Sequence, residues 1–154
     1  MKVEEVMNAT VYTCKPSDSL NAAAQLMWAR DIGCLAVIDD QGKAVGMVTD
    51  RDLLMCTHLS GKHLAEEVVS TAMSKTLHSV RLGESVQTAE SMMQKSQVRR
   101  LAVVNAEGRI AGILSLNDLA LAAGKKRDIR PEEVVATLAS ICQPRPGSAA
   151  ASRA

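Results

Sequence analysis

The sequence predicts an α/β (α+β) protein made of two β-α-β-β-α repeats that pack about a pseudo-two-fold axis. The first observation is internal duplication: a shift of 66 residues aligns Met7–Leu53 with Met73–Leu119 without a gap, and 12 of these 47 positions are identical. The second is that each copy has the same order of apolar runs and turn residues. Two similar units in one short chain usually pack face to face, which leaves two related clefts between them.

Each repeat is expected to begin with an extended segment, Thr10–Cys14 or Thr76–Val80, followed by a turn and a helix. Ser19 and Ser85 are expected helix N-caps, because a serine oxygen accepts a hydrogen bond from the free amides of a first helical turn. Both helices carry one apolar stripe at helical spacing. Its residues are Leu20, Ala23, Leu26 and Met27 in the first copy and Val86, Ala89, Met92 and Met93 in the second.

A β-hairpin follows each of these helices. Its first strand is a short apolar run, Leu35–Ile38 or Leu101–Val104, of the kind that is buried on both faces of a sheet. Gly42 and Gly108 stand at the turn position that needs positive φ. The return strands are expected at Ala44–Val48 and Ile110–Leu114, and the second helices from Asp50 and Leu116.

These elements divide the chain into repeat 1 over 1–60, repeat 2 over 61–124, a C-terminal helix over 125–143 and a tail over 144–154. Residues 54–72 connect the copies and are expected to be partly helical. Pro131 followed by two glutamates fits the first turn of the terminal helix. The tail is rich in Pro, Gly, Ser and Ala, so we expect it to be disordered.

Composition argues against several classes of function. Eighteen basic and 17 acidic residues give a net charge of +1, without the basic excess of a nucleic-acid binder, and aromatic residues make up only 1%. Four separated cysteines without a C-x-x-C pair indicate reduced, mostly buried thiols. Met1–Glu5 carries two acids where a signal peptide would become apolar, and no apolar run reaches the length of a membrane span. A cytoplasmic location is therefore expected.

One motif recurs where a strand turns into a helix. Gly46–Asp52 and Gly112–Asp118 both have the form G-h-h-[ST]-x-x-D, in which h is an apolar residue. One interpretation is a capping box, in which Thr49 or Ser115 caps the helix and the aspartate bonds back to the cap amide. The other is a nucleotide site, because a helix N-terminus attracts phosphate and an aspartate there can accept the hydroxyls of a ribose. The two interpretations do not exclude each other.

Taken together, these features resemble a known family. The duplicated G-h-h-[ST]-x-x-D turns, the lead-in Glu4–Met7 and the repeated LAVxxxxGxxxG strand pattern are similar to a tandem pair of cystathionine-β-synthase (CBS) domains, over roughly residues 1–122. The resemblance implies a non-catalytic regulatory module, often called a Bateman module, that signals to a partner protein. It implies an adenosyl ligand (AMP, ADP, ATP, NAD or S-adenosylmethionine) in the clefts, and often a homodimer shaped like a flat disc.

The resemblance also implies which residues form each cleft, namely the entering strand of one repeat and the turn of the other. One cleft is expected to use Met7, Thr10, Val11, Tyr12 and Thr13 for the adenine, with Ser115 and Asp118 for the ribose. The other is expected to use Met73, Thr76, Leu77, His78 and Ser79 with Thr49 and Asp52. Arg51 and Asn117 occupy equivalent places within the two turns.

The phosphates of a nucleotide need positive charge, which the two clefts provide unequally. Arg99 and Arg100 stand just before Leu101–Val104, where related modules place a basic pair that faces phosphate, and the planar fork of arginine suits phosphate oxygens. The equivalent residues of the first repeat are Gly33 and Cys34, which are uncharged. We therefore expect one cleft to prefer a phosphorylated ligand. Another interpretation of the arginine pair is a solvated strand edge.

Two other functions remain open at this point. The clefts could be vestigial, which would leave a module for dimerisation or docking. Cys14, Cys34 and Cys56, together with the histidines, would suit a thiol or metal sensor, but their irregular spacing argues against a metal site. No arrangement of nucleophile, base and acid can be identified, so we expect no catalytic activity.

Overall fold

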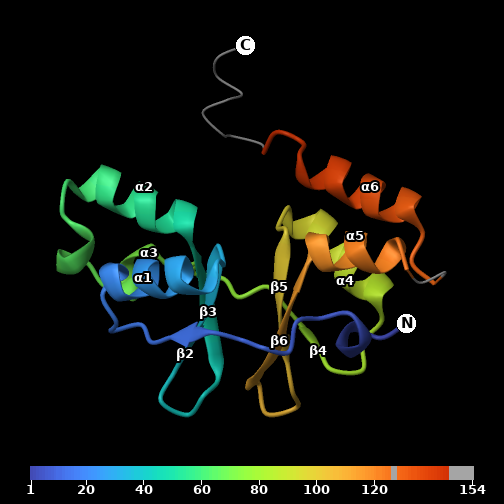
Figure 1. Cartoon of the computed structure of the whole chain (residues 1–154), viewed down its shortest axis with the longest axis horizontal. Coiled ribbons are helices and arrows are strands. Elements are labelled where there is room, and N and C mark those ends of the chain that lie inside the picture. Colours follow the sequence, from blue (N-terminus) through green and yellow to red (C-terminus); the bar gives the residue numbers. More distant parts are fainter. Residues whose placement is uncertain (126–127, 146–154) are drawn as a thin grey trace.

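The computed structural model describes residues 1–125 and 128–145, which form two three-stranded sheets with helices around them. The first half consists of β1 (Thr13–Cys14), α1 (Leu20–Arg30), β2 (Cys34–Ile38), β3 (Ala44–Thr49) and α2 (Asp50–Ser60). The second half consists of β4 (Ser79–Arg81), α4 (Val86–Ser96), β5 (Arg100–Val104), β6 (Ile110–Ser115) and α5 (Leu116–Ala123). Figure 1 shows the halves side by side, and they meet where β3 contacts β5.

The two sheets have the same topology. In each sheet the first strand is parallel to the second, and the second is antiparallel to the third. Lys43 and Arg109, which are equivalent in the two repeats, pair with each other across an antiparallel bridge between the halves. A two-fold axis therefore passes between them, and the predicted α/β class and repeat order are confirmed.

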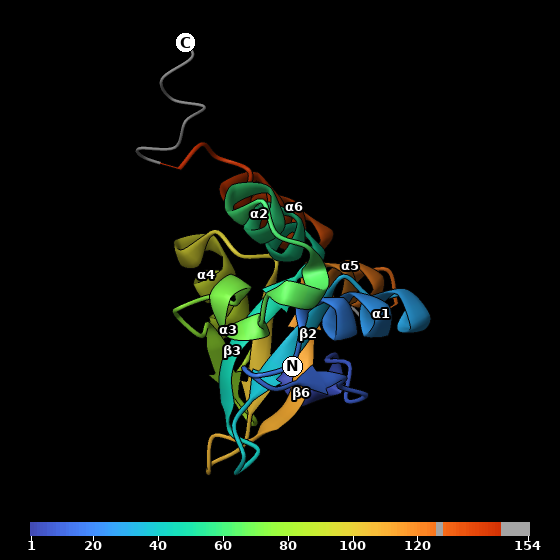
Figure 2. The same cartoon turned by 90° about the vertical axis from the view of Figure 1, so that its left-hand side faces the viewer.

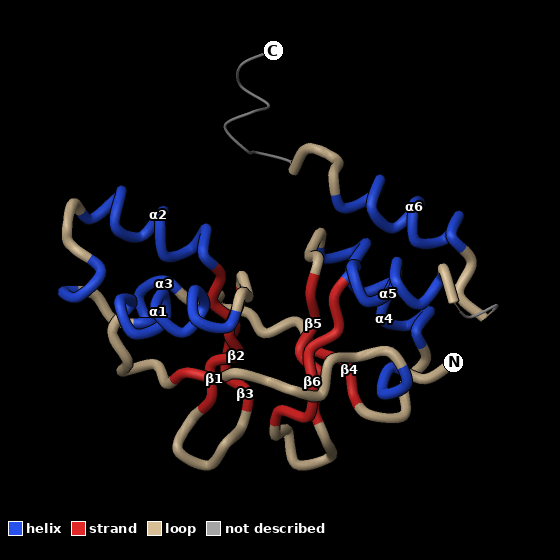
Figure 3. Tube along the Cα trace, viewed as in Figure 1, coloured by secondary structure: helices blue, strands red, loops and turns tan. Residues whose placement is uncertain are grey.

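The predicted turns and caps also match the structure. The Ser19 oxygen accepts a hydrogen bond from the Ala22 amide (3.1 Å), and Gly42 and Gly108 both have φ of +77°. The entering segments differ from the prediction: only Thr13–Cys14 of the first pairs as a strand. The earlier residues of that segment cross from one half to the other instead of pairing within one sheet, as the tube in Figure 3 shows.

The segments that precede each repeat are exchanged between the halves. These segments contain η1 (Val3–Glu5), η2 (Leu64–Glu66) and α3 (Val69–Ala72). The Val3 amide donates to the Glu84 carbonyl of the second half (2.9 Å), and the Val69 amide donates to the Asp18 carbonyl of the first half (2.8 Å). Val3 is fully buried in the core of the second half, and Val69 is fully buried in the core of the first. Each half is therefore completed by sequence that precedes the other half.

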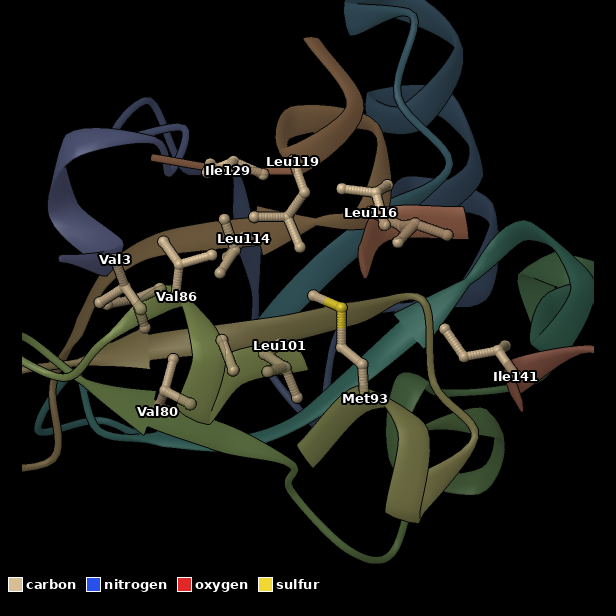
Figure 4. Packing of buried hydrophobic residues seen from close by; sticks show 13 residues of the cluster. Val3, Val80, Val86, Met93, Leu101, Leu114, Leu116, Leu119, Ile129 and Ile141 are labelled. Carbon is tan, nitrogen blue, oxygen red and sulfur yellow. The ribbon is translucent and has the colours of Figure 1, made fainter. Parts of the chain in front are cut away.

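Each half has its own hydrophobic core. The first core packs residues of β2 and β3 against α1 and α2. The second core is larger, because Ile129, Val134 and Ile141 from the C-terminal part of the chain join it. Figure 4 shows this second core, with Val3 at one end and Ile141 at the other.

The C-terminal helix α6 (Pro131–Ile141) packs on α4 and α5, and it begins at the proline as predicted. In Figures 1 and 2, α6 and α2 lie at the same side of the molecule, above the other elements. Of the predicted disordered tail, residues 146–154 lie outside the described residues, as do Lys126 and Arg127. Within the described part of the chain, no helix has the length and apolar character needed to cross a bilayer.

All four cysteines are free. Cys14 and Cys34 are buried, Cys56 is half-buried and Cys142 is exposed, so the expectation of mostly buried thiols holds for two of the four. Burial raises the pKa of the Cys14 thiol to about 12, with the Asp18 carboxylate adding to the rise. Cys14 is therefore a neutral thiol at physiological pH.

Candidate functional site

The two G-h-h-[ST]-x-x-D turns are capping boxes of nearly identical geometry. Asp52 Oδ2 accepts hydrogen bonds from the Thr49 amide (2.8 Å) and hydroxyl (2.8 Å), and the Asp52 amide donates to Thr49 Oγ1 (3.2 Å). In the second repeat, Asp118 Oδ2 accepts from the Ser115 amide (2.7 Å) and hydroxyl (2.6 Å). The capping interpretation is therefore confirmed in both repeats.

Capping engages only one oxygen of each aspartate. The other oxygen, Oδ1 of Asp52 or of Asp118, accepts no hydrogen bond from the described residues. Both side chains are half-buried, so this second oxygen is held in place by the bonds to the first. A fixed carboxylate oxygen at a helix start is an acceptor for a sugar hydroxyl.

The two faces of each sheet have different surroundings. Helices cover one face, to which Leu35 and Leu101 contribute core side chains. The next residues, Ala36 and Ala102, point the other way and are fully buried although they belong to neither core. This second face therefore turns toward the other repeat, where β3 contacts β5.

The predicted residues of the entering segments differ in the direction of their side chains. Tyr12 packs against the first core, and its ring centroid lies 4.8 Å from Cζ of Arg30, so its side chain points to the helices. His78 lies directly before β4 and is half-buried. Thr13 and Ser79 directly precede the core residues Cys14 and Val80 within β1 and β4, so they point away from the helices, toward the other repeat. Val11 and Leu77 are half-buried in the segments that lead into these strands.

Arg100 brings positive charge from the second repeat to the turn of the first. Its Nη2 atom lies 3.7 Å from the point that a Cβ on Gly33 would occupy, and Asp50 Oδ2 lies 3.3 Å from the same point. Asp50 is the first residue of α2 and follows Thr49 directly. No ion pair between described residues engages Arg100. Its half-buried guanidinium is therefore free to bind an anion at the start of α2, where helix amides also attract negative charge.

The equivalent place in the other cleft holds a buried thiol. Cys34 stands in β2 where Arg100 stands in β5. Burial raises the pKa of the Cys34 thiol; the Arg100 guanidinium opposes this rise, and the carboxylates of Asp50 and Asp118 reinforce it. Equivalent positions of the two repeats thus carry different charge, a guanidinium in β5 and a thiol in β2.

Met7 and Met73 each lie against the motif glycine of the other repeat. A Cβ on Gly112 would lie 3.0 Å from Met7 Cγ and 3.1 Å from the Asn8 carbonyl oxygen, and a Cβ on Gly46 would lie 3.3 Å from Met73 Sδ. These glycines therefore admit the segments that cross between the halves.

The remaining predicted residues are exposed to solvent. They are Thr10, Arg51, Thr76, Arg99 and Asn117. Asp50, which lies beside Arg100, was not among the predicted residues. From the sequence, Asp50 is expected only as the start of the second helix. The signal that distinguishes it is the difference between Asp50 and the equivalent Leu116 of the second repeat.

Within residues 1–125 and 128–145, no three His, Cys, Asp or Glu side chains are close enough to hold a metal ion. A concavity of about 500 Å³ lies between α1 and α2, on the helical side of the first half. Only its end near Gly33 and Asp50 approaches the candidate cleft.

Comparison with known proteins places the chain in a family. The model of the CBS domain matches it twice, over residues 3–57 and 65–125. CBS domain-containing protein YhcV of Bacillus subtilis is 34% identical over 119 residues, which cover 77% of this chain and 83% of that protein. Hypoxic response protein 1 of Mycobacterium tuberculosis is 30% identical over 140 residues, which cover 91% of this chain and 93% of that protein.

Solved structures agree with these matches. Hypoxic response protein I with two coordinated zinc ions has a TM-score of 0.72 at 30% identity, covering 79% of this chain and 98% of that one. CBSX2 in complex with AMP has a TM-score of 0.72 at 30% identity, covering 82% of this chain and 98% of that one. The chain therefore belongs to the CBS domain family and carries two copies of the domain.

Proposed function

We propose that this CBS pair is a non-catalytic regulatory module that binds an adenosine phosphate in the cleft containing Thr49, Asp52 and Arg100. The observation that carries the proposal is the position of Arg100, a free guanidinium from one repeat at the helix start of the other. The structure of CBSX2 with AMP supports the choice of ligand, because that protein is 30% identical to this chain.

In the proposed complex, each part of the ligand meets one part of the cleft. Asp52 Oδ1 accepts a ribose hydroxyl while Oδ2 keeps its capping bonds. Arg100 and the first amides of α2 bind the phosphate. Leu77 and Ser79 lie beside the adenine in a site without aromatic residues. The ligand thereby contacts both repeats.

A ligand that contacts both repeats stabilises the relative orientation of the halves to which it binds more tightly. We propose that a partner protein, which is not identified, reads this orientation. The second cleft, with Asp118 and the uncharged Cys34, would favour an adenosyl ligand without phosphate, such as S-adenosylmethionine. The module would then distinguish two metabolites by charge.

Titration calorimetry of the full chain with AMP, ADP, ATP, NAD, S-adenosylmethionine and adenosine tests the proposal. Arg100→Ala should weaken AMP binding about 10- to 100-fold, because a hydrogen bond to a charged group contributes roughly 1.5–3 kcal/mol. Adenosine binding should be unchanged in this variant. Asp52→Asn should weaken both ligands. Arg109→Ala, which removes an exposed hairpin arginine, is the matched control and should leave binding intact.

Absence of binding of all six compounds by folded protein would remove the proposal and favour a docking module. An equal loss of AMP and adenosine affinity in Arg100→Ala would contradict the assignment of Arg100 to the phosphate. A thiol sensor is less favoured, because a reactive cysteine needs a lowered thiol pKa and burial raises those of Cys14 and Cys34.

A further inference from the structure

A concavity of about 430 Å³, the hairpin pocket, lies beside the β5–β6 turn of the second half. Its walls come from β4 and the turn that follows it, from α4 and from the β5–β6 turn. Figure 1 shows the β5–β6 turn at the end of the molecule opposite to α2 and α6. The lining contains neither Asp52 nor Arg100, so this pocket differs from the nucleotide cleft. Its polar and charged residues are Ser79, Arg81, Glu84, Asn105 and Glu107.

The equivalent place in the first half is bridged by an ion pair. Lys15 Nζ lies 2.7 Å from Asp40 Oδ1, and this contact joins the turn after β1 to the β2–β3 turn. A shift of 66 residues turns Lys15 into Arg81 and Asp40 into Ala106, and both of these residues line the hairpin pocket. The second half therefore keeps the cation of the pair but has a methyl group in place of the anion.

The guanidinium of Arg81 has no anionic partner in the described part of the chain. The ion pairs there do not include Arg81. Glu84, in the same turn, accepts a hydrogen bond at Oε2 from the Arg81 backbone amide (2.7 Å) and not from the guanidinium. The space beside Ala106 can therefore admit the carboxylate of a ligand, which would pair with Arg81 as Asp40 pairs with Lys15.

Asn105 supplies a second donor to the pocket. Its Oδ1 atom accepts hydrogen bonds from the Glu107 amide (3.1 Å) and the Arg109 amide (2.9 Å), which fixes the orientation of the side chain. Its Nδ2 group donates to no residue that the structure describes. The equivalent residue of the first half is Asp39, which has no such donor. A guanidinium and an amide group can together bind both oxygens of a carboxylate.

The same pocket carries two carboxylates. Glu84 is half-buried, and its Oε1 atom accepts no hydrogen bond from a described residue. Glu107 is exposed and stands where the first half has the uncharged Gln41. These two acids outnumber the single guanidinium, so the lining disfavours a phosphate and attracts a ligand that also carries positive charge.

We propose that the hairpin pocket binds a free α-amino acid with an apolar side chain. The ligand carboxylate bonds to Arg81 and Asn105, and its ammonium group bonds to Glu107. Met92 and Val104 add apolar side chains to the lining, against which the ligand side chain packs. A volume of about 430 Å³ is in the usual range for a small-molecule site. The proposal does not depend on nucleotide binding.

Amide NMR of the full chain, titrated with L-leucine, tests this site, because each amide signal reports on one residue. The signals of residues 79–84 and 104–108 should shift, and those of residues 49–52 should not. Ala106→Asp restores the carboxylate that the first half has at this place, so it should pair with Arg81 and abolish the shifts. Arg109→Ala removes an exposed arginine of the same turn that does not line the pocket, and this matched control should keep them.

Two analogues of L-leucine separate the two charged contacts. Isocaproate lacks the ammonium group and isoamylamine lacks the carboxylate, so each should bind about 10- to 100-fold more weakly than L-leucine. Arg81→Gln should weaken L-leucine by a similar factor and leave isoamylamine unchanged. Glu107→Gln should weaken L-leucine and leave isocaproate unchanged. All of the substituted side chains are exposed, so the remaining amide signals should stay in their native positions.

Three outcomes would overturn the proposal. The first is that L-leucine, L-valine, L-methionine and L-phenylalanine all leave the signals of residues 79–84 and 104–108 unmoved. The second is that L-leucine still binds to Ala106→Asp. The third is that isocaproate binds as tightly as L-leucine, which would show that the ammonium group is not recognised.

Discussion

The motif glycines of this CBS pair are required by the chain itself. Gly46 and Gly112 are buried in β3 and β6, where the segments that cross between the halves pass over them. A side chain at Gly112 would meet the Asn8 carbonyl oxygen at 3.1 Å, and this backbone atom cannot move without shifting the crossing segment. Glycine is therefore selected at the site by backbone approach, whether or not a ligand is bound.

Gly112→Ala should lower the free energy of unfolding by about 1–3 kcal/mol, the usual cost of an added methyl group in a packed site. Chemical denaturation measures this change in the free energy of unfolding. Gly124→Ala is the control, because a Cβ there meets the Leu121 and Ala120 carbonyl oxygens at ordinary contact distances of 3.7 and 4.0 Å, and φ is −70°. Pairing Gly112→Ala with Met7→Ala should recover part of the loss. Equal stability of Gly112→Ala and the unaltered chain would contradict this account.

For individual residues, the sequence predicted the hydrogen bonds within the two turns but not all of the residues that contact these turns from the other repeat. The serine or threonine, the aspartate three residues later and the helix start are local, so the capping boxes could be predicted from spacing. The contact of Met7 with Gly112 joins residues 105 positions apart, and no local pattern encodes it. The meeting of Arg100 with Asp50 depends in the same way on how the halves pack.

Among the elements, α6 is held against α4 by a contact that includes a buried carboxyl group. Glu90 on α4 is 5% exposed, and its Oε1 atom has no hydrogen-bond partner among the residues that the structure describes. Burial raises the pKa of Glu90 above its ordinary value of 4.5; the Glu133 carboxylate of α6 adds to the rise, and a hydrogen bond with Thr137 opposes it. Folding therefore favours the protonated form.

Because folding raises the pKa of Glu90, the contribution of this residue to the free energy of unfolding falls as pH rises. Well below pH 4.5 Glu90 is protonated in both the folded and unfolded chains. As pH rises, the unfolded chain loses this proton first, so the stability contributed by Glu90 falls until the folded group has also ionised. Glu90→Gln should therefore match the unaltered chain near pH 4 and exceed its stability at pH 7 by about 1–2 kcal/mol.

Thermal unfolding from pH 4 to pH 8 measures the effect, with Glu107→Gln, in the exposed β5–β6 turn, as the control. A constant difference across this range would show that Glu90 does not titrate in the interface.

The elements themselves were largely predictable from the sequence, because helical spacing, N-cap serines and turn glycines are local signals. Two features were not. The entering segments pair over fewer residues than their composition indicates, since Thr10–Tyr12 connect two halves. The position of α6 against α4 and α5 could not be predicted either, because α6 is apolar on two faces and the sequence does not show which face packs inward.

At the scale of the whole molecule, the exchanged segments should couple the two halves. Val3 belongs to the second core and Val69 to the first, and both are fully buried. Val3→Ala should lower the free energy of unfolding by about 1–3 kcal/mol, from the lost burial and the cavity left behind. Because each half needs a segment attached to the other, both halves should lose stability together.

Hydrogen exchange, read separately over β2 and β5, measures this coupling. The slowest amides of both strands should exchange faster by the same factor in Val3→Ala, and likewise in the mirrored variant Val69→Ala. Faster exchange confined to β5 in Val3→Ala would show that the halves unfold independently.

The exchange of the segments that precede each repeat has a consequence for the origin of such a chain. In a single repeat, the preceding segment would have no core of its own to pack against. Two identical repeats could each bury the preceding segment of the other. Such a pair would have true rotational symmetry. Duplication and fusion of its gene would yield the present architecture, after which the halves could diverge, one acquiring Arg100 and the other Cys34.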